Sequence, residues 1–326
     1  MGKIKDLYRL FVEYQQDKKK CQGLNIKVFN FCQLENPRDL WFYKYIEKHF
    51  GSNLTKENEV AVFSLYSFRS KLRLNHSKTK IWFASENINF YPQYSDHCLN
   101  QVDLSLAFEY IDHEKYLRFP LWFLYFIDPE YNYTAVKAAV YRMSHFNYKE
   151  QNDERKFCSL VCNHDVHGNR TQIFDALKEI ATIDSGGAFL NNTPDLKIKY
   201  RDNKREFISK YKFNICPENS NSKGYVTEKV FEAIYSGCIP VYWGSNNNPE
   251  PDVLNKDAIL FYSGPESLPD LKKKVLELWE NKKLYNDFIS QEKFLPHATE
   301  YVWDTLSDFH HRLEKLVKQS AYRSII

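Results

Sequence analysis

Several features that would announce a function are missing from this 326-residue sequence. Residues 1–20 hold no long apolar run, so we expect neither a signal peptide nor a membrane anchor. Neither GxGxxG nor GxxxxGK[ST] occurs, which leaves a dinucleotide-type Rossmann site and a P-loop unsupported. No Asp-x-Asp motif follows a predicted strand, so no metal bound to a diphosphate is indicated there.

The sequence also lacks a charge excess and a disulfide pattern. Lys and Arg number 45 against 42 Asp and Glu, and a net charge of +3 argues against nucleic acid as a partner. Seven irregularly spaced cysteines, an odd number, favour a reducing compartment. Cys158, Cys162, His164 and His167 imitate a metal cluster, but the close Cys-x2-Cys pair of zinc sites is missing. We therefore expect no metal.

The remaining composition suits a globular protein of two domains. Hydrophobic residues make up 43% of the chain, enough for two cores at this length. Apolar runs alternate with helical patterns, which indicates α/β domains with largely parallel sheets. A charged stretch puts the domain boundary near residue 150, and an amphipathic helix spans 301–326. The predicted strands are 26–31, 60–65, 80–83, 102–108, 157–161, 213–216, 239–243 and 259–262.

One stretch, residues 213–244, gathers polar side chains at a single point: FNICPENSNSKGYVTEKVFEAIYSGCIPVYWG. It reads as a strand, a polar loop, a helix with Thr227 as N-cap, and a second strand. Ligands of open α/β sheets bind outside the carboxyl ends of strands, and helix N-termini favour anions. A carboxylate there suits ribose hydroxyls and a lysine suits phosphate. An ordinary strand–helix–strand unit with a solvated loop fits the pattern equally well.

The same stretch resembles the donor-binding signature of the α-1,3/α-1,4-fucosyltransferases that use GDP-fucose, glycosyltransferase family 10. Glu218–Asn219, Tyr225–Lys229 and Ile239–Val241 match it, whereas Pro217 stands where the family often has Phe. The resemblance implies a donor site in which Glu228 holds ribose hydroxyls, Lys229 holds phosphate, and Glu218 senses the fucose or orients the loop. Asn219 and Tyr225 would line the pocket.

Two further residues match the family outside this signature. Glu86 follows the strand of KIWFASEN, residues 80–87, and resembles the glutamate taken as general base. A carboxylate within hydrogen-bond reach would remove the proton of an acceptor hydroxyl. Arg170 stands at a predicted helix N-terminus and matches an arginine that contacts the donor pyrophosphate. The alternatives are a surface or capping glutamate and a surface arginine.

The resemblance implies the GT-B fold, two Rossmann-like α/β domains facing across a cleft. Residues 1–150 would bind the acceptor, 151–300 would bind GDP-fucose, and the 301–326 helix would pack across both. The implied reaction is inverting transfer of L-fucose from GDP-β-L-fucose to O3 of N-acetylglucosamine in an N-acetyllactosamine-type glycan. The products would be Lewis-type glycans, as on lipopolysaccharide.

Some choices stay open at this point. Transfer to O4, another sugar-nucleotide transferase of this architecture, and a non-catalytic glycan- or nucleotide-binding module are the alternatives. The resemblance implies GDP-fucose and an N-acetyllactosamine-type acceptor glycan as partners. With Arg170 and Lys229 in place of a metal, no cofactor would be required, and whether a metal stimulates activity stays open. The N-terminus suggests a bacterial-type cytoplasmic protein with at most peripheral membrane contact; a fragment of an anchored enzyme is the alternative. The sequence leaves the oligomeric state open.

Overall fold

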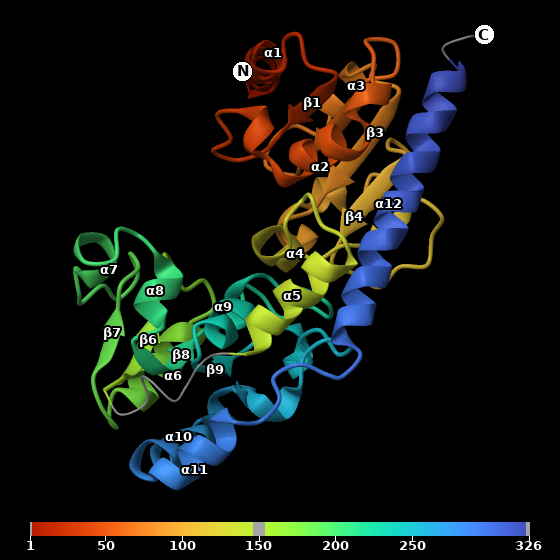
Figure 1. Cartoon of the computed structure of the whole chain (residues 1–326). Coiled ribbons are helices and arrows are strands. Elements are labelled where there is room, and N and C mark those ends of the chain that lie inside the picture. Colours follow the sequence, from red (N-terminus) through yellow and green to blue (C-terminus); the bar gives the residue numbers. More distant parts are fainter. Residues whose placement is uncertain (1, 146–153, 324–326) are drawn as a thin grey trace. The chain divides into compact units, whose positions relative to one another are not determined.

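The computed structural model describes residues 2–145 and 154–323, and it divides into two compact units (Figure 1). The first unit comprises Met1–Ala135 and Trp303–Ile326, and the second comprises Val136–Val302. The prediction of an α/β protein with two parallel sheets is confirmed. The predicted boundary near residue 150 lies outside the described residues, and the division between the units comes earlier, after Ala135.

The first unit is built on five parallel strands in the order β1-β2-β3-β4-β5. All residues of β2 and β4 are buried, as expected when both faces of a parallel sheet are covered. The three-residue β5 was not predicted, because so short a run has no readable period. The strands are β1 (Ile26–Phe29), β2 (Val60–Phe63), β3 (Thr79–Phe83), β4 (Leu104–Ala107) and β5 (Tyr116–Arg118).

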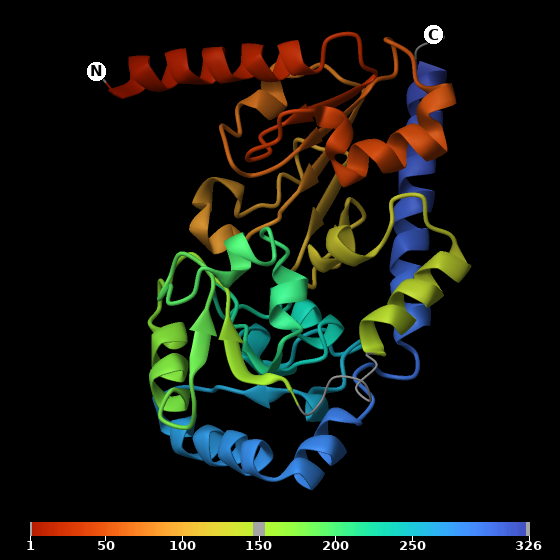
Figure 2. The same ribbon diagram turned by 60° about the vertical axis from the view of Figure 1, so that its left-hand side comes forward.

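Aromatic side chains hold the last helix, α12 (Ala298–Arg323), to the first sheet. The ring of Phe309 lies 6.0 Å from Phe42 of α2 and 5.1 Å from Phe119, which follows β5. Phe42 in turn packs edge-on against Phe83 of β3 at 4.9 Å. From Trp303 onward, α12 therefore belongs to the N-terminal unit and completes its core (Figures 1 and 2). The helices of this unit are α1 (Gly2–Lys20), α2 (Trp41–Phe50), α3 (Lys71–Leu74) and α4 (Trp122–Phe126).

The second unit has five parallel strands in the order β10-β9-β8-β6-β7. This is the doubly wound order in which the direction of winding reverses between the first and third strands, here β6 and β8. Apolar residues of α6, α10 and α11 pack in one core cluster with these strands. The strands are β6 (Lys156–Leu160), β7 (Ile183–Ser185), β8 (Tyr211–Ile215), β9 (Ile239–Tyr242) and β10 (Leu260–Phe261).

The remaining helices belong to the second unit or lead into it. They are α5 (Tyr133–Ser144), α6 (Asn169–Leu177), α7 (Asp195–Ile198), α8 (Lys204–Ile208), α9 (Lys229–Tyr235), α10 (Leu268–Glu280) and α11 (Lys282–Ile289). Each helix within residues 2–145 and 154–323 is too short or too polar to cross a membrane.

Candidate functional site

The point where the winding of the second sheet reverses brings two polar loops together. Strand β6 ends at Leu160 and β8 ends at Ile215, and these residues are register partners in adjacent parallel strands. Both strands therefore release their chains at the same edge of the sheet. In doubly wound sheets, ligands bind in the crevice outside this reversal point. The candidate site is thus formed by the loop 161–168 and the loop 216–228.

Arg170, the second residue of α6, joins the two loops. Its Nη1 donates to the carbonyl oxygen of His164 at 2.5 Å, on the loop after β6. Its Nη2 donates to the carbonyl oxygen of Pro217 at 2.9 Å and to Oδ1 of Asn219 at 3.0 Å, on the loop after β8. The residue is only 3% exposed, and its Nε has no hydrogen-bond partner within the described part of the chain. A permanent cation thus sits between the loops with its Nε donor unused.

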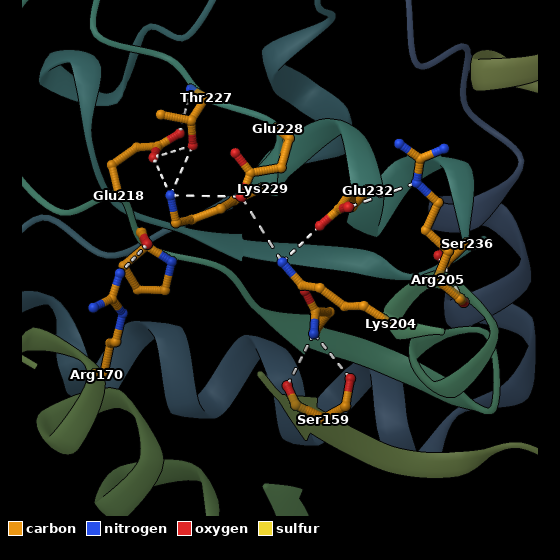
Figure 3. A network of polar contacts seen from close by, with 12 residues as sticks. Ser159, Arg170, Lys204, Arg205, Glu218, Thr227, Glu228, Lys229, Glu232 and Ser236 are labelled. Carbon is orange, nitrogen blue, oxygen red and sulfur yellow. Dashed lines mark hydrogen bonds and ion pairs between the residues drawn. The ribbon is translucent and has the colours of Figure 1, made fainter. Parts of the chain in front are cut away.

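Glu218 ties the end of β8 to the start of α9 (Figure 3). Its Oε1 accepts from the Thr227 amide at 2.8 Å, and its Oε2 accepts from the Thr227 hydroxyl at 2.6 Å. Lys229 Nζ donates to the same Oε2 at 3.0 Å and to Thr227 Oγ1 at 2.8 Å. The Glu218 side chain is fully buried, whereas 17% of the Lys229 side chain is exposed. The two ends of the loop are therefore joined through the buried Glu218 carboxylate, and its ion-pair partner Lys229 is partly exposed at the surface.

Thr227 was predicted as the N-cap of α9, and that prediction is wrong. The cap position is held by Glu228, which makes no side-chain capping bond, and the Thr227 hydroxyl points to Glu218 instead. A buried carboxylate needs strong donors, and the Thr227 amide and hydroxyl supply two of them. The sequence contains both partners, Glu218 and the Thr-Glu-Lys segment that begins at Thr227. Their spacing of nine residues gives no indication that Glu218 and Thr227 are in contact.

The pKa values of the Glu218 and Glu228 carboxyl groups are shifted in opposite directions. Burial raises the pKa of Glu218 above its ordinary value; Lys229 opposes the rise and Glu228 adds to it. Burial also acts to raise the pKa of Glu228, but Lys229 and Lys204 outweigh it and hold that pKa below its ordinary value. Glu228 is therefore ionised at neutral pH, with 15% of its side chain exposed, and suits acceptance from hydroxyl groups.

Lys204 was missed by the sequence reasoning. Its Nζ lies 2.6 Å from Glu232 and 3.9 Å from Glu228, while Arg205 pairs with Glu232 at 3.6 Å. Glu228 and Glu232 are four residues apart and share a helix face, where like charges repel. That spacing was a signal that cations from another element, here α8, must lie against this face.

The other predicted donor residues differ in exposure. Asn219 is half-buried and accepts from Arg170, whereas Tyr225 is only 1% exposed and packs inside the unit. That Tyr225 lines the donor pocket stays a prediction. Gly187, after β7, passes so close to the loop after β6 that a Cβ there would lie 2.1 Å from the carbonyl oxygen of Cys162. This position accepts only glycine.

The Cys and His residues after β6 do not assemble into a metal-binding group. Cys158 is completely buried in β6, and His164 and His167 are exposed. Within the described ranges, no three His, Cys, Asp or Glu side chains are grouped as a metal would require.

Glu86 belongs to the first unit, whereas the six predicted donor residues all belong to the second. It follows β3 in the segment Ser85–Asn87 and is half-buried. Its neighbours are aromatic: Ser85 Oγ donates to the Tyr66 hydroxyl at 3.0 Å, and Glu86 adds to the rise in the pKa values of Tyr66 and Tyr91 that burial causes. A carboxylate at a strand end beside tyrosines fits a role as base toward a hydroxyl.

Sequence comparisons connect both units to one group of proteins. Residues 150–325 match the domain described as "Glycosyltransferase family 10 (fucosyltransferase) C-term", and residues 26–125 match "Alpha-(1,3)-fucosyltransferase FucT N-terminal domain". The "Alpha-(1,3)-fucosyltransferase FucT" of Helicobacter pylori is 33% identical over 205 residues, 56% of this chain and 40% of that protein. "Alpha-(1,3)-fucosyltransferase B" of Drosophila melanogaster is 33% identical over 134 residues, 38% of this chain and 30% of that protein. The matched regions thus span less than half of these relatives.

Solved structures share the fold. The structure titled "Crystal Structure of alpha1,3-Fucosyltransferase" superposes with a TM-score of 0.61 at 22% identity and covers 89% of both chains. The structure titled "Crystal Structure of alpha1,3-Fucosyltransferase with GDP-fucose" gives a TM-score of 0.60 at 21% identity, covering 89% of this chain and 90% of that one. The predicted fold class, two Rossmann-like domains of the GT-B type, is confirmed by this match.

Proposed function

The chain belongs to glycosyltransferase family 10, the fucosyltransferases, and we propose that it transfers L-fucose from GDP-β-L-fucose to O3 of N-acetylglucosamine in an N-acetyllactosamine-type glycan. Support comes from the relatives named as α-(1,3)-fucosyltransferases and from the fold shared with one that holds GDP-fucose. The observation that carries the proposal is the arginine bridge: Arg170 links both loops at the reversal point of the sheet.

The donor would be held by the second unit. Arg170 and Lys229 are cations at the starts of α6 and α9, the helices that follow the two loops of the candidate site, and a nucleoside diphosphate needs such charges. Glu228 is ionised and partly exposed beside Lys229, and it would accept from ribose hydroxyls. Glu218 is saturated by Thr227 and Lys229, which supports a role in shaping the loop over a direct contact with fucose.

The transfer would be a single displacement with inversion. Glu86 takes the proton of the acceptor hydroxyl as that oxygen bonds to the anomeric carbon of fucose. The bond from that carbon to the β-phosphate oxygen breaks, its electron pair stays on GDP, and the β-linked donor becomes an α-linked product. The diphosphate gains charge in this step, and Arg170 and Lys229 would stabilise it most strongly in the transition state. We propose that these two cations suffice without a metal.

The test of the donor site is Arg170→Lys. Lysine keeps the charge but loses the planar fork that contacts Pro217 and Asn219 together. The loss of one hydrogen bond between this charged group and the diphosphate would cost about 1.5–3 kcal/mol. The Kd for GDP should therefore rise by about 10- to 100-fold. Titration calorimetry with GDP measures this. Arg205→Lys, in the same unit but paired with Glu232, is the matched control and should bind as the wild type does. Equal losses in both variants, or none in Arg170→Lys, would reject the bridge as a phosphate contact.

We further propose that the protein works in the cytoplasm, in contact with an anionic membrane surface. All seven cysteines are free, which fits a reducing compartment. Helix α1 exposes Ile4, Leu7, Tyr8 and Phe11 by at least 60% each, a stripe at helical spacing, and it ends in three lysines. Co-sedimentation with phosphatidylglycerol vesicles should exceed that with phosphatidylcholine vesicles, and Phe11→Ser should lower it. Equal sedimentation with both lipids and both proteins would refute the contact.

A further inference from the structure

A pocket of about 570 Å³ opens in the first unit, and one of its lining residues, Tyr66, is hydrogen-bonded to Ser85, the residue before Glu86. Three aromatic residues, Tyr66, Phe68 and Tyr91, line it together with the charged side chains of Arg9, Glu13 and Arg69. All of these residues belong to the first unit, so the pocket is complete without the second. Its volume is in the range of small-molecule sites.

The pocket adjoins the predicted base. Tyr66 follows strand β2 and accepts a hydrogen bond from Ser85, the residue before Glu86. The ring of Tyr91 is perpendicular to that of Tyr66, with ring centroids 6.1 Å apart. The charge of the Glu86 carboxylate adds to the rise in the pKa of both tyrosines, which places it near both rings. A molecule whose hydroxyl meets Glu86 would therefore extend toward these rings.

The charges of the pocket are already paired. Arg9 lies over the ring of Phe68 at 4.6 Å and within 3.7 Å of Glu13. Arg69 Nη2 donates to Asp96 at 2.6 Å and its Nη1 donates to the Gln93 carbonyl oxygen at 2.5 Å. Tyr66 remains 39% exposed, so ring surface is accessible. Aromatic surface among hydrogen-bonding groups of balanced charge suits an uncharged sugar, which has one apolar face and a rim of hydroxyls.

One wall of the pocket comes from outside the family-matched segments. Arg9 and Glu13 lie on α1, and the N-terminal family match begins at residue 26. The helix is fixed by Lys71, which is 2% exposed and lies 2.7 Å from Asp17 and 3.4 Å from Glu13. The α1 wall is thus held by buried ion pairing, although it is not part of the matched domain.

We propose that this pocket is a subsite for a second, uncharged sugar of the acceptor, the one attached to the sugar that receives fucose, and that α1 supplies its outer wall. The inference rests on the proposed transferase function for the position of the reacting hydroxyl. It makes Phe68 and Arg9 specificity-determining residues for acceptor length, with no part in the chemical step.

The test is the ratio of kcat/KM for N-acetyllactosamine to that for free N-acetylglucosamine. The wild type should favour the disaccharide, and Phe68→Ala should lower the ratio by about 3- to 10-fold, the scale of a lost aromatic contact. Arg9→Ala, on an exposed helix surface, should lower it in the same direction and cannot unfold the core. Tyr125→Ala, an exposed tyrosine of α4 away from the pocket, is the control and should leave the ratio unchanged.

An unchanged ratio in both pocket variants of an active enzyme would overturn the subsite. If the wild type transfers fucose to neither acceptor, the proposed function fails, and saturation-transfer NMR with N-acetyllactosamine decides the pocket alone. Binding signals that disappear in Phe68→Ala support the subsite, and equal signals in both proteins contradict it. A signal from a sialylated trisaccharide without one from the neutral disaccharide would also contradict it.

Discussion

Replacing Lys229 by methionine would leave the Glu218 carboxylate, whose side chain is fully buried, without its cation. Breaking a buried ion pair by removing one partner costs about 3–5 kcal/mol when the other charge stays. Glu218 has a second route, since it can take up a proton, at a cost of about 1.4 kcal/mol for each pH unit above its unfolded pKa. The observed loss of stability should be the smaller of the two at each pH.

The sign of the pH dependence follows from the direction of the shift. Burial already raises the pKa of Glu218 above its ordinary 4.5, and Lys229 is the group that opposes this rise. In Lys229→Met the folded pKa rises further, so the folded state holds a proton that the unfolded state releases. Below the unfolded pKa both states are protonated and the penalty is absent. The penalty grows with pH between the unfolded and the folded pKa of the variant and levels off above the folded pKa.

Urea unfolding at pH 5 and pH 8 measures this difference. Relative to wild type, Lys229→Met should lose about 3 kcal/mol more at pH 8 than at pH 5. Lys204→Met is the matched control, because Glu232 keeps Arg205 as a partner, and its loss should vary little over this range. Adding Glu218→Gln to Lys229→Met removes the charge and should abolish the pH dependence. A loss for Lys229→Met that is equal at both pH values would refute the argument.

Two more outcomes are expected. Glu86→Gln should keep GDP affinity while transfer falls by at least ~100-fold, the low end for general-base catalysis, and retained transfer in a coupled GDP-release assay would eliminate Glu86 as base. Gly187→Ala should destabilise the protein by about 1–3 kcal/mol in urea unfolding, because its Cβ would meet the backbone of Cys162. Gly51→Ala, whose Cβ would have the flexible end of the Glu47 side chain as its nearest neighbour, is the control. Equal stability of the two alanine variants would contradict the close approach.

The strands of both sheets were predictable where apolar runs are long. The runs at 60–65, 80–83 and 213–216 became β2, β3 and β8, each nearly fully buried. The three-residue strands β5 and β7 were missed, because side-chain alternation cannot be recognised over so few residues. Strand order is a long-range property, so the reversal between β6 and β8 could not be read from the chain.

The candidate site was predictable as a set of residue types but not as a set of contacts. The resemblance pointed to Arg170, Asn219, Glu218 and Lys229. The hydrogen bonds that join them link Arg170 to Asn219 across 49 positions and Lys229 to Glu218 across 11. The prediction that Thr227 caps α9 was wrong for the same reason. Its hydroxyl donates to the buried Glu218 carboxylate, which requires hydrogen-bond donors, and this distant contact outweighs the local capping preference. Lys204 was missed because its partners lie on another helix.

The most direct measurement of the central claim is incubation of the wild-type protein with GDP-fucose and each of the two galactosyl-N-acetylglucosamine isomers, followed by linkage analysis of the product. We expect release of GDP and an α-linked fucose on O3 of the N-acetylglucosamine in Galβ1-4GlcNAc. Turnover with a UDP-sugar or GDP-mannose but none with GDP-fucose, or a β-linked product, would contradict it.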